Sequence, residues 1–284
     1  MKKSMMAMAA AAMLLTACNN EPEMVLTVKE STDTMKTVTI NFSFPQVTQQ
    51  PMTRGTLAES QMTDLWMFDY LDGSLVQTKR QASTDDGFGS IAVTAETGNH
   101  QFCFVASRGS NPTVTDGVIT WEKPSDTFWQ NVILNLTPQT ATAQTVELQR
   151  VATRLRISII DEVPATLSKL SVTADSWHNG LDALTGEPTE AISRTATINV
   201  PSSYAGTTGQ LTASIFGLCS DDYTTDVIVS AIDAENATIA SVSLSDLPLK
   251  RNHTTNYSGP LFTRQPTFGL TAADAWGDDV EMAW

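Results

Sequence analysis

The sequence predicts an all-β protein built from two tandem β-sandwich domains. Apolar and polar residues alternate from Val38 to Phe44, and this period of two is typical of a half-buried strand. The strongest of several turn signals is Asp116-Gly117, which separates two short apolar runs in the manner of a hairpin. The chain is also rich in Thr, Ser and Val, which favours strands. Short strands divided by turns indicate sandwiches rather than alternating strands and helices.

The first half of the chain begins with the alternating strand at residues 37–44. The apolar and aromatic run Leu65-Trp66-Met67-Phe68-Asp69-Tyr70 is the next, and the turn Leu71-Asp72-Gly73 ends it. Further strands are expected at residues 74–76, 102–106, 113–115 and 118–120. One helix is predicted, with Ser125 or Asp126 as its N-cap, and it runs through Phe128, Trp129, Val132 and Ile133 before Pro138.

The second half repeats the strand pattern, with runs at residues 155–160, 170–174, 195–200, 211–219, 227–232 and 239–244. So many strands exceed one small sandwich, and the break is placed near Leu148-Gln149-Arg150-Val151, where one strand ends and the next begins. The expected organisation is a signal peptide at 1–17, a lipidated cysteine and tether at 18–35, and β-sandwich domains at 36–150 and 151–284. A fragment starting at Val151 is expected to fold alone.

The N-terminus has the features of a lipoprotein signal peptide. Lys2 and Lys3 precede an apolar stretch at residues 5–15, which is shorter than the roughly 20 residues that span a bilayer. The stretch ends in Leu15-Thr16-Ala17-Cys18, which looks like a bacterial lipobox. Cys18 is therefore the predicted lipidation site, and its acyl chains would anchor the mature protein to a membrane.

Composition and charge exclude one class of partner. The 284 residues include 17 Lys and Arg against 31 Asp and Glu, which gives a net charge of −14. A chain this acidic repels a phosphate backbone, so no nucleic acid is expected as a partner. Hydrophobic residues make up 41% of the chain and charged residues 17%, a balance that supports a folded core rather than disorder.

Motifs for catalysis, metal binding or cofactor binding were not found in the sequence. His100, His178 and His253 lie far apart, and there is no His-Glu-x-x-His, Gly-x-Ser-x-Gly or phosphate-binding loop. No enzyme activity, metal or cofactor is therefore expected. The acidic pairs Asp85-Asp86, Asp221-Asp222 and Asp278-Asp279 lack the spacing of a calcium loop, which favours exposed turns.

The cysteines and tryptophans leave alternatives open. Cys103 and Cys219 fall in different predicted domains, and a disulfide needs Cα atoms within about 7 Å, so buried free thiols are favoured over a bridge. Trp66 is expected in the core. The other tryptophans either complete the cores or form a stacking platform for glycans; they are Trp121, Trp129 and Trp177 near turns, and Trp276 and Trp284 at the C-terminus.

Four short motifs carry a resemblance to a known family. In chain order they are Met52-Thr53-Arg54-Gly55, the run Met62-Thr63-Asp64-Leu65-Trp66-Met67-Phe68-Asp69, the run Arg150-Val151-Ala152-Thr153-Arg154-Leu155-Arg156-Ile157, and Leu249-Lys250-Arg251-Asn252-His253-Thr254-Thr255. Behind a lipobox, this order resembles the fimbrillin superfamily of Bacteroidetes, in particular its FimB/Mfa2-type fimbrial anchor subunits. The resemblance implies two transthyretin-like β-sandwich domains, export as a lipoprotein, assembly by strand exchange, and neither catalysis nor a cofactor.

The resemblance also gives Arg54 a possible role. Stalk subunits of the superfamily lose their leading strand when an Arg-specific protease cuts behind an arginine, whereas anchor subunits keep both strand and lipid. Arg54 follows the strand at 37–44 and is the possible cleavage site, with a plain surface turn as the alternative. If Arg54 is cut, the chain resembles a stalk or tip subunit; if it is not, an anchor.

The expected function is that of a lipid-anchored, surface-exposed fimbrial subunit of the outer membrane, with a structural or adhesive role. Its expected partners are other fimbrial subunits, the outer membrane through the acyl anchor, and surface ligands of a host or of other bacteria. The alternatives are a stalk or tip subunit cleaved after Arg54, and a surface lipoprotein that captures glycans for nutrition.

Replacing the lipidation site tests the anchor. Cys18→Ala should release the protein from membranes into the soluble fraction, because it removes the only site predicted to carry acyl chains. Membrane fractionation and incorporation of labelled palmitate measure this. Retention of the variant in the membrane at the level of the native chain would show that Cys18 is not the anchor.

Overall fold

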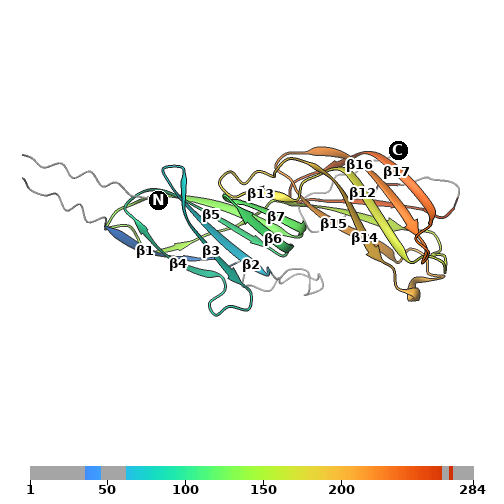
Figure 1. Ribbon diagram of the computed structural model, residues 1–284, viewed down its shortest axis with the longest axis horizontal. Helices are drawn as coiled ribbons and strands as arrows, with labels where there is room; N and C mark the ends of the chain where they lie inside the picture. The colour runs from blue at the N-terminus through green and yellow to red at the C-terminus, as the bar shows by residue number, and fades with distance from the viewer. Residues whose placement is uncertain (1–35, 46–61, 264–268, 271–284) are drawn as a thin grey trace, which may run out of the picture. The chain divides into compact units, whose positions relative to one another are not determined.

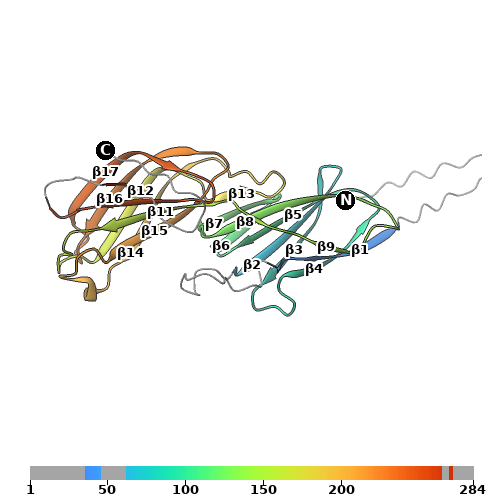
Figure 2. The same cartoon turned by 180° about the vertical axis from the view of Figure 1, so that it is seen from behind.

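The computed structural model describes residues 36–45, 62–263 and 269–270, and its strands form five sheets (Figures 1 and 2). The prediction of an all-β sandwich fold is confirmed. In the part of the chain that is described, the one named helical element is a 3-10 turn at Ser202–Tyr204. Cys18, Arg54, Trp276, Trp284 and the pair Asp278-Asp279 lie outside the described residues.

The first sandwich consists of two sheets that enclose an apolar core. One sheet has the strand order β4 (Ser90–Glu96), β1 (Thr37–Ser43), β9 (Ala143–Thr145). The other has the order β10 (Gln149–Arg150), β8 (Thr127–Leu136), β5 (Gly98–Ser107), β2 (Asp64–Leu71), β3 (Ser74–Ala82). The buried residues between them include Ile40, Phe42, Phe44, Leu65, Met67, Phe102 and Phe104.

Strand β2 is buried along seven consecutive residues, because both faces of its sheet are covered. Leu65 and Met67 point into the core of the first sandwich. Trp66, Phe68 and Tyr70 point to the other face, where they pack against a third sheet. That sheet has the order β13 (Gly180–Asp182), β7 (Val118–Lys123), β6 (Ser110–Thr115).

The hairpin between β6 and β7 confirms the turn predicted from Asp116-Gly117. Thr115 pairs with Val118, so the two residues between them form the whole loop. Both have positive φ, 49° at Asp116 and 82° at Gly117, as a type I′ turn requires.

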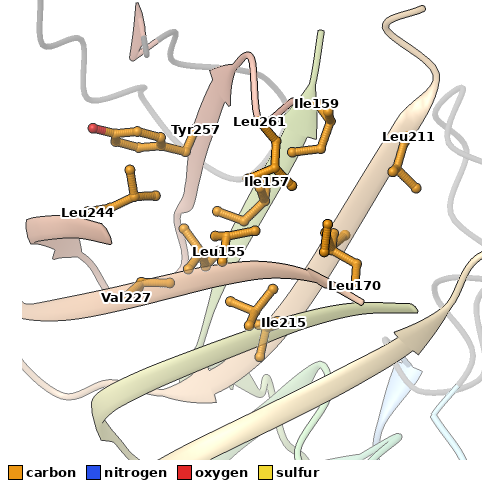
Figure 3. Packing of buried hydrophobic residues seen from close by; sticks show 14 of the residues in the cluster. Leu155, Ile157, Ile159, Leu170, Leu211, Ile215, Val227, Leu244, Tyr257 and Leu261 are labelled. Atoms are coloured by element: carbon orange, nitrogen blue, oxygen red, sulfur yellow. The ribbon is translucent and has the colours of Figure 1, made fainter. Parts of the chain in front are cut away.

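The second sandwich also has two sheets. One has the order β15 (Leu211–Leu218), β11 (Ala152–Ile159), β18 (Thr254–Gly259), β19 (Gly269–Leu270). The other has the order β14 (Ile192–Asn199), β12 (Lys169–Trp177), β16 (Tyr223–Ile232), β17 (Thr238–Leu249). Figure 3 shows the core between them, to which β11 contributes Leu155, Ile157 and Ile159.

The parallel pairing of β11 with β18 brings two of the sequence motifs together. Arg154 lies opposite Thr254, and their side chains are joined by a hydrogen bond of 3.0 Å from Nε to Oγ1. The main chain continues the contact, because Asn252 N–H donates to Ala152 C=O at 2.9 Å. Residues a hundred positions apart in the chain therefore lie side by side.

A buried cluster of residues from both halves of the chain surrounds the third sheet. Strand β13 pairs with β7, and Leu181 and Leu218 share an apolar cluster with Trp66 and Trp121. The two indole rings are 6.2 Å apart and nearly perpendicular. The boundary at residue 150 and the independent folding of a fragment from Val151 stay predictions, and such a fragment would uncover Leu181 and Leu218.

An ion pair between Arg150 and Asp126 lies at the predicted boundary near residue 150, and Arg150 also contacts Asn252 in the second half of the chain. The Arg150 guanidinium donates to both carboxylate oxygens of Asp126, at 2.7 and 3.0 Å, and to Asn252 Oδ1 at 3.0 Å. The guanidinium also lies 4.7 Å from the centre of the Phe128 ring. Burial raises the pKa of Asp126, and the hydrogen bonds and charge of Arg150 oppose that rise.

The predicted helix at residues 125–133 is wrong. Residues 127–136 form β8, which pairs with β5 along its whole length. The apolar residues of this segment fit either periodicity over so short a stretch, and pairing with a buried neighbour decides the outcome. Asp126 does not cap a helix, because its carboxylate is bound to Arg150.

The cluster around the third sheet predicts a large effect of Trp121. Trp121→Ala should lower the free energy of unfolding by roughly 3–5 kcal/mol, because the indole is fully buried and its removal leaves a cavity. The control Ile228→Ala alters a side chain that is 47% exposed, and it should change stability by about 0.5 kcal/mol or less. Urea unfolding measures both. Equal losses in the two variants would contradict the prediction.

Candidate functional site: the slot of strand β1

Strand β1 is the central strand of its sheet. All seven of its residues pair antiparallel with β4, from Thr37 opposite Glu96 to Ser43 opposite Ser90. On the other side only its last three residues pair with β9, in the parallel direction. We call the space between β4 and β9 that β1 occupies the β1 slot.

Three side chains of β1 and that of Phe44, which directly follows it, fill the core with four apolar groups. Val38, Ile40, Phe42 and Phe44 are all at least 92% buried. The Phe42 ring lies 5.0 Å from that of Phe102, and the Phe44 ring lies 4.8 Å from that of Phe104. An empty slot would expose the aromatic face of β5, so the fold needs a strand at this position.

The outward face of β1 is polar and exposed. Thr39 and Thr94 form a hydroxyl hydrogen bond of 2.9 Å across the strands. At the end of the strand, Val146 N–H donates to Ser43 C=O at 2.9 Å. Main-chain pairing and alternate apolar side chains are thus the two features that hold β1, and both could be supplied by an equivalent strand from another chain.

A buried acid–base pair lies beside the start of β1. His100 Nδ1 is 2.6 Å from Asp69 Oδ1, and both side chains are at most 2% exposed. His100 Nε2 lies 3.0 Å from the Glu96 carbonyl oxygen and donates to it, and the Phe102 ring stacks 5.4 Å away. A cavity of about 340 Å³ adjoins the pair and is also lined by Thr37 and Glu96.

The contacts of this pair lie within the protein. His100 Nδ1 meets the Asp69 carboxylate and Nε2 meets the Glu96 carbonyl oxygen, so both ring nitrogens have partners on neighbouring strands. Burial raises the pKa of Asp69, and the hydrogen bond and charge of His100 oppose that rise. The Asp69 carboxyl is thus kept inside the sheet by its hydrogen bond to His100.

The other histidines contact main-chain oxygens. His178 Nδ1 lies 2.6 Å from Thr189 C=O, and His253 Nδ1 lies 2.7 Å from Arg251 C=O, so each nitrogen donates. Among residues 36–45, 62–263 and 269–270, no three His, Cys, Asp or Glu side chains gather in a way that could hold a metal ion.

The two described cysteines are free and buried, as predicted. Burial raises the pKa of Cys103 to about 12 and that of Cys219 to about 12. A thiol with so high a pKa is almost fully protonated at neutral pH, so both cysteines act as small apolar residues in the core.

The burial of the described tryptophans decides between core positions and an exposed platform for glycans. Trp66, Trp121 and Trp177 are at most 1% exposed, so they belong to the cores. Trp129 is half-buried, and its Nε1–H donates to Ala183 C=O at 2.8 Å. The suggestion that Trp121, Trp129 and Trp177 form a glycan platform is wrong, because two of the three rings are inaccessible to a sugar.

The acidic pairs within the described residues lie in exposed loops, as predicted. Asp85 and Asp86 sit in the turn after β3, where the Asp85 carboxylate accepts a hydrogen bond from Ala82 N–H at 2.8 Å. Asp222 forms an exposed ion pair with Lys250 at 2.9 Å. These carboxylates shape turns and bind neighbours rather than surround a cation.

Sequence reasoning missed the two buried polar networks, of Asp69 with His100 and of Asp126 with Arg150. One signal was available for the first, because an acid inside the apolar run 65–70 must find a partner if the run is buried. The partner itself lies on another strand, and only strand pairing brings it close.

Residues 114–283 match a family of unknown function (DUF6562), and the chain belongs to this family. The chain is also similar to solved structures. A proposed adhesin from Bacteroides ovatus superposes with a TM-score of 0.52 at 15% identity, over 87% of this chain and 96% of that one. Proposed polysaccharide binding proteins (DUF1812) from Bacteroides thetaiotaomicron give 0.51 at 10% identity, over 86% and 97%.

The fimbrial anchor protein Mfa2 from Porphyromonas gingivalis superposes with a lower TM-score of 0.44, at 11% identity over 78% of this chain and 90% of that one. At these identities, the adhesin and the polysaccharide binding proteins establish a shared fold. No curated protein matches the sequence. Within the described ranges, no helix is long and apolar enough to cross a membrane.

The raised pKa of Asp69 predicts a pH effect. A carboxyl with a higher pKa in the folded than in the unfolded chain contributes stability that is complete below about pH 4 and is lost as the pH rises through the folded pKa. The free energy of unfolding should therefore fall, relative to that of Asp69→Asn, as the pH rises from 4 to 7. Urea unfolding of both chains across this range measures the effect. A native chain that gains stability relative to Asp69→Asn as the pH rises would contradict the prediction.

Proposed function

We propose that this protein is a lipid-anchored fimbrial subunit of the outer membrane, of the anchor type, which joins other subunits by exchange of β-strands. The observation that carries the proposal is the place of β1. It is a central strand that, together with the following Phe44, fills the core with four side chains, yet it lies entirely before Arg54 in the chain. The lipidation site and the leading strand are therefore on the same side of the candidate cleavage site.

This order of Cys18, β1 and Arg54 makes covalent anchoring and cleavage exclude each other. A cut after Arg54 would break the covalent link between the lipid and residues 55–284, and only non-covalent pairing of β1 would hold the folded protein at the membrane. An uncut chain keeps both. The tether from Cys18 to Thr37 spans roughly 60 Å when extended, which keeps the first sandwich close to the bilayer.

Strand exchange fits the geometry of the slot. A donor strand would pair with β4 through main-chain hydrogen bonds and would place alternate side chains in the pockets of Val38, Ile40, Phe42 and Phe44. The shared fold with a proposed adhesin supports a role at the cell surface. The stalk or tip subunit cleaved after Arg54 is the second candidate, in which a neighbour's strand replaces β1.

The state of Arg54 in cells distinguishes the candidates. For an anchor, mass spectrometry of the protein from outer membranes should find acylated Cys18 at the N-terminus and an intact Arg54-Gly55 bond. Arg54→Ala should then leave fimbriae unchanged, whereas Cys18→Ala should detach them from the cell. For a stalk or tip subunit, the mature chain should begin at Gly55, and Arg54→Ala should block assembly. A mature chain that begins at Gly55 contradicts the anchor proposal.

A further inference from the structure

Within residues 36–45, 62–263 and 269–270, strand β8 has one fully paired edge and one edge that is mostly open. It pairs with β5 along all ten residues, but on its other side only Phe128 and Trp129 pair with β10. Val151 N–H donates to Thr127 C=O at 2.9 Å on that side, so the odd-numbered residues of β8 direct their main-chain groups there. We call residues 131–135 on this side the open edge of β8.

The open edge presents three residues with outward main-chain groups. The Asn131 carbonyl accepts a hydrogen bond from Gln130 Nε2 at 2.9 Å, and the Asn135 carbonyl accepts one from Thr140 Oγ1 at 3.4 Å. Ile133 has no such partner among the described residues. Its side chain is 72% exposed, more than any other large apolar side chain described.

Three of the long edge strands, β3, β14 and β17, carry features that prevent strands from pairing, and the open edge of β8 carries none. β3 has Lys79 and Arg80, β14 has Arg194, and β17 has Pro248. β8 contains no charged residue and no proline, and its pairing with β5 shows no bulge. The uncharged strand β15 is partly covered, because Trp177 Nε1–H donates to Phe216 C=O at 3.0 Å.

The sequence of the open edge is close to symmetric about its centre. Asn131-Val132-Ile133-Leu134-Asn135 reads almost alike in both directions. If two copies met antiparallel about a two-fold axis at Ile133, then Ile133 would face Ile133, Val132 would face Leu134, and Asn131 would face Asn135. The outward main-chain groups of Ile133 make the central pair a hydrogen-bonded one.

We propose that the open edge of β8 pairs with the same edge of a second copy of this chain, antiparallel and centred on Ile133. About six main-chain hydrogen bonds would form over five residues. The two Ile133 side chains would pack together on one face of the joined sheet. Val132 and Leu134, which are only partly buried, would become more buried on the other face. A carbonyl oxygen accepts two hydrogen bonds, so the contacts of Gln130 and Thr140 need not break.

The net charge of the chain and the small area of the contact both limit the strength of this dimer. Each copy has a net charge of −14, but the joined strands are neutral, and salt at about 0.15 M screens charges more than roughly 8 Å apart. Five paired residues bury less surface than a permanent dimer needs. The expected dimer is therefore weak, and it forms at high protein concentration in physiological salt.

Sedimentation of the full chain tests the proposal, in a Cys18→Ala background that removes the lipid and one thiol. The chain with the native edge should show a monomer–dimer equilibrium with a Kd below about 1 mM. Ile133→Lys should weaken the dimer at least about tenfold, because the two-fold axis places the two lysines opposite each other. The matched control is Ile228→Lys, at an exposed Ile of β16, a strand paired on both sides; it should leave the equilibrium unchanged.

Cysteine cross-linking gives an independent measurement. In a hydrogen-bonded antiparallel pair the Cα atoms are about 5.5 Å apart, which a disulfide can bridge. Ile133→Cys should therefore form a covalent dimer under mild oxidation, whereas Ile228→Cys should not. Cys103 and Cys219 are buried and should not react. A native chain that stays monomeric at 1 mM, or equal cross-linking of the two variants, would overturn the proposal, and binding of an unrelated peptide alone would not rescue it.

Discussion

The structure depends on the burial of one sheet on both faces. The sheet that contains β2, β5 and β8 has the first sandwich core on one face and the third sheet on the other. Seven consecutive residues of β2 are buried as a result, and their apolar area removed from water stabilises the fold. The same arrangement joins the halves of the chain, because the cover on the second face includes Leu181 and Leu218.

Complete burial makes each polar group in that sheet costly unless it is paired. Asp69 lies within the buried run of β2, and His100 on the neighbouring strand meets it. Asp126, just before β8, is met by Arg150. Each pair joins elements that are distant in the chain. Both pairs therefore help to fix the positions of strands within a buried sheet.

The other sheet of the first sandwich, which contains β4, β1 and β9, holds its central strand by a different set of contacts. β1 is held by one full antiparallel neighbour, one short parallel neighbour and a row of apolar side chains. Nothing in that arrangement requires the strand to be covalently joined to the rest of the fold. That property is consistent with the strand exchange proposed above, in which the state of the bond after Arg54 separates the anchor from the stalk or tip subunit.

The sequence by itself determined the class of the fold and most strands, because alternation of apolar residues and turn residues such as Asp116-Gly117 are local properties. It also predicted free buried thiols at Cys103 and Cys219 and a core role for Trp66. Only the tertiary structure decided that residues 127–136 are a strand, that Trp121 and Trp177 are inaccessible, and that Asp69 meets His100. These outcomes depend on which strands become neighbours. The strands concerned are tens of residues apart in the chain, so their pairing is decided only when the sheets form.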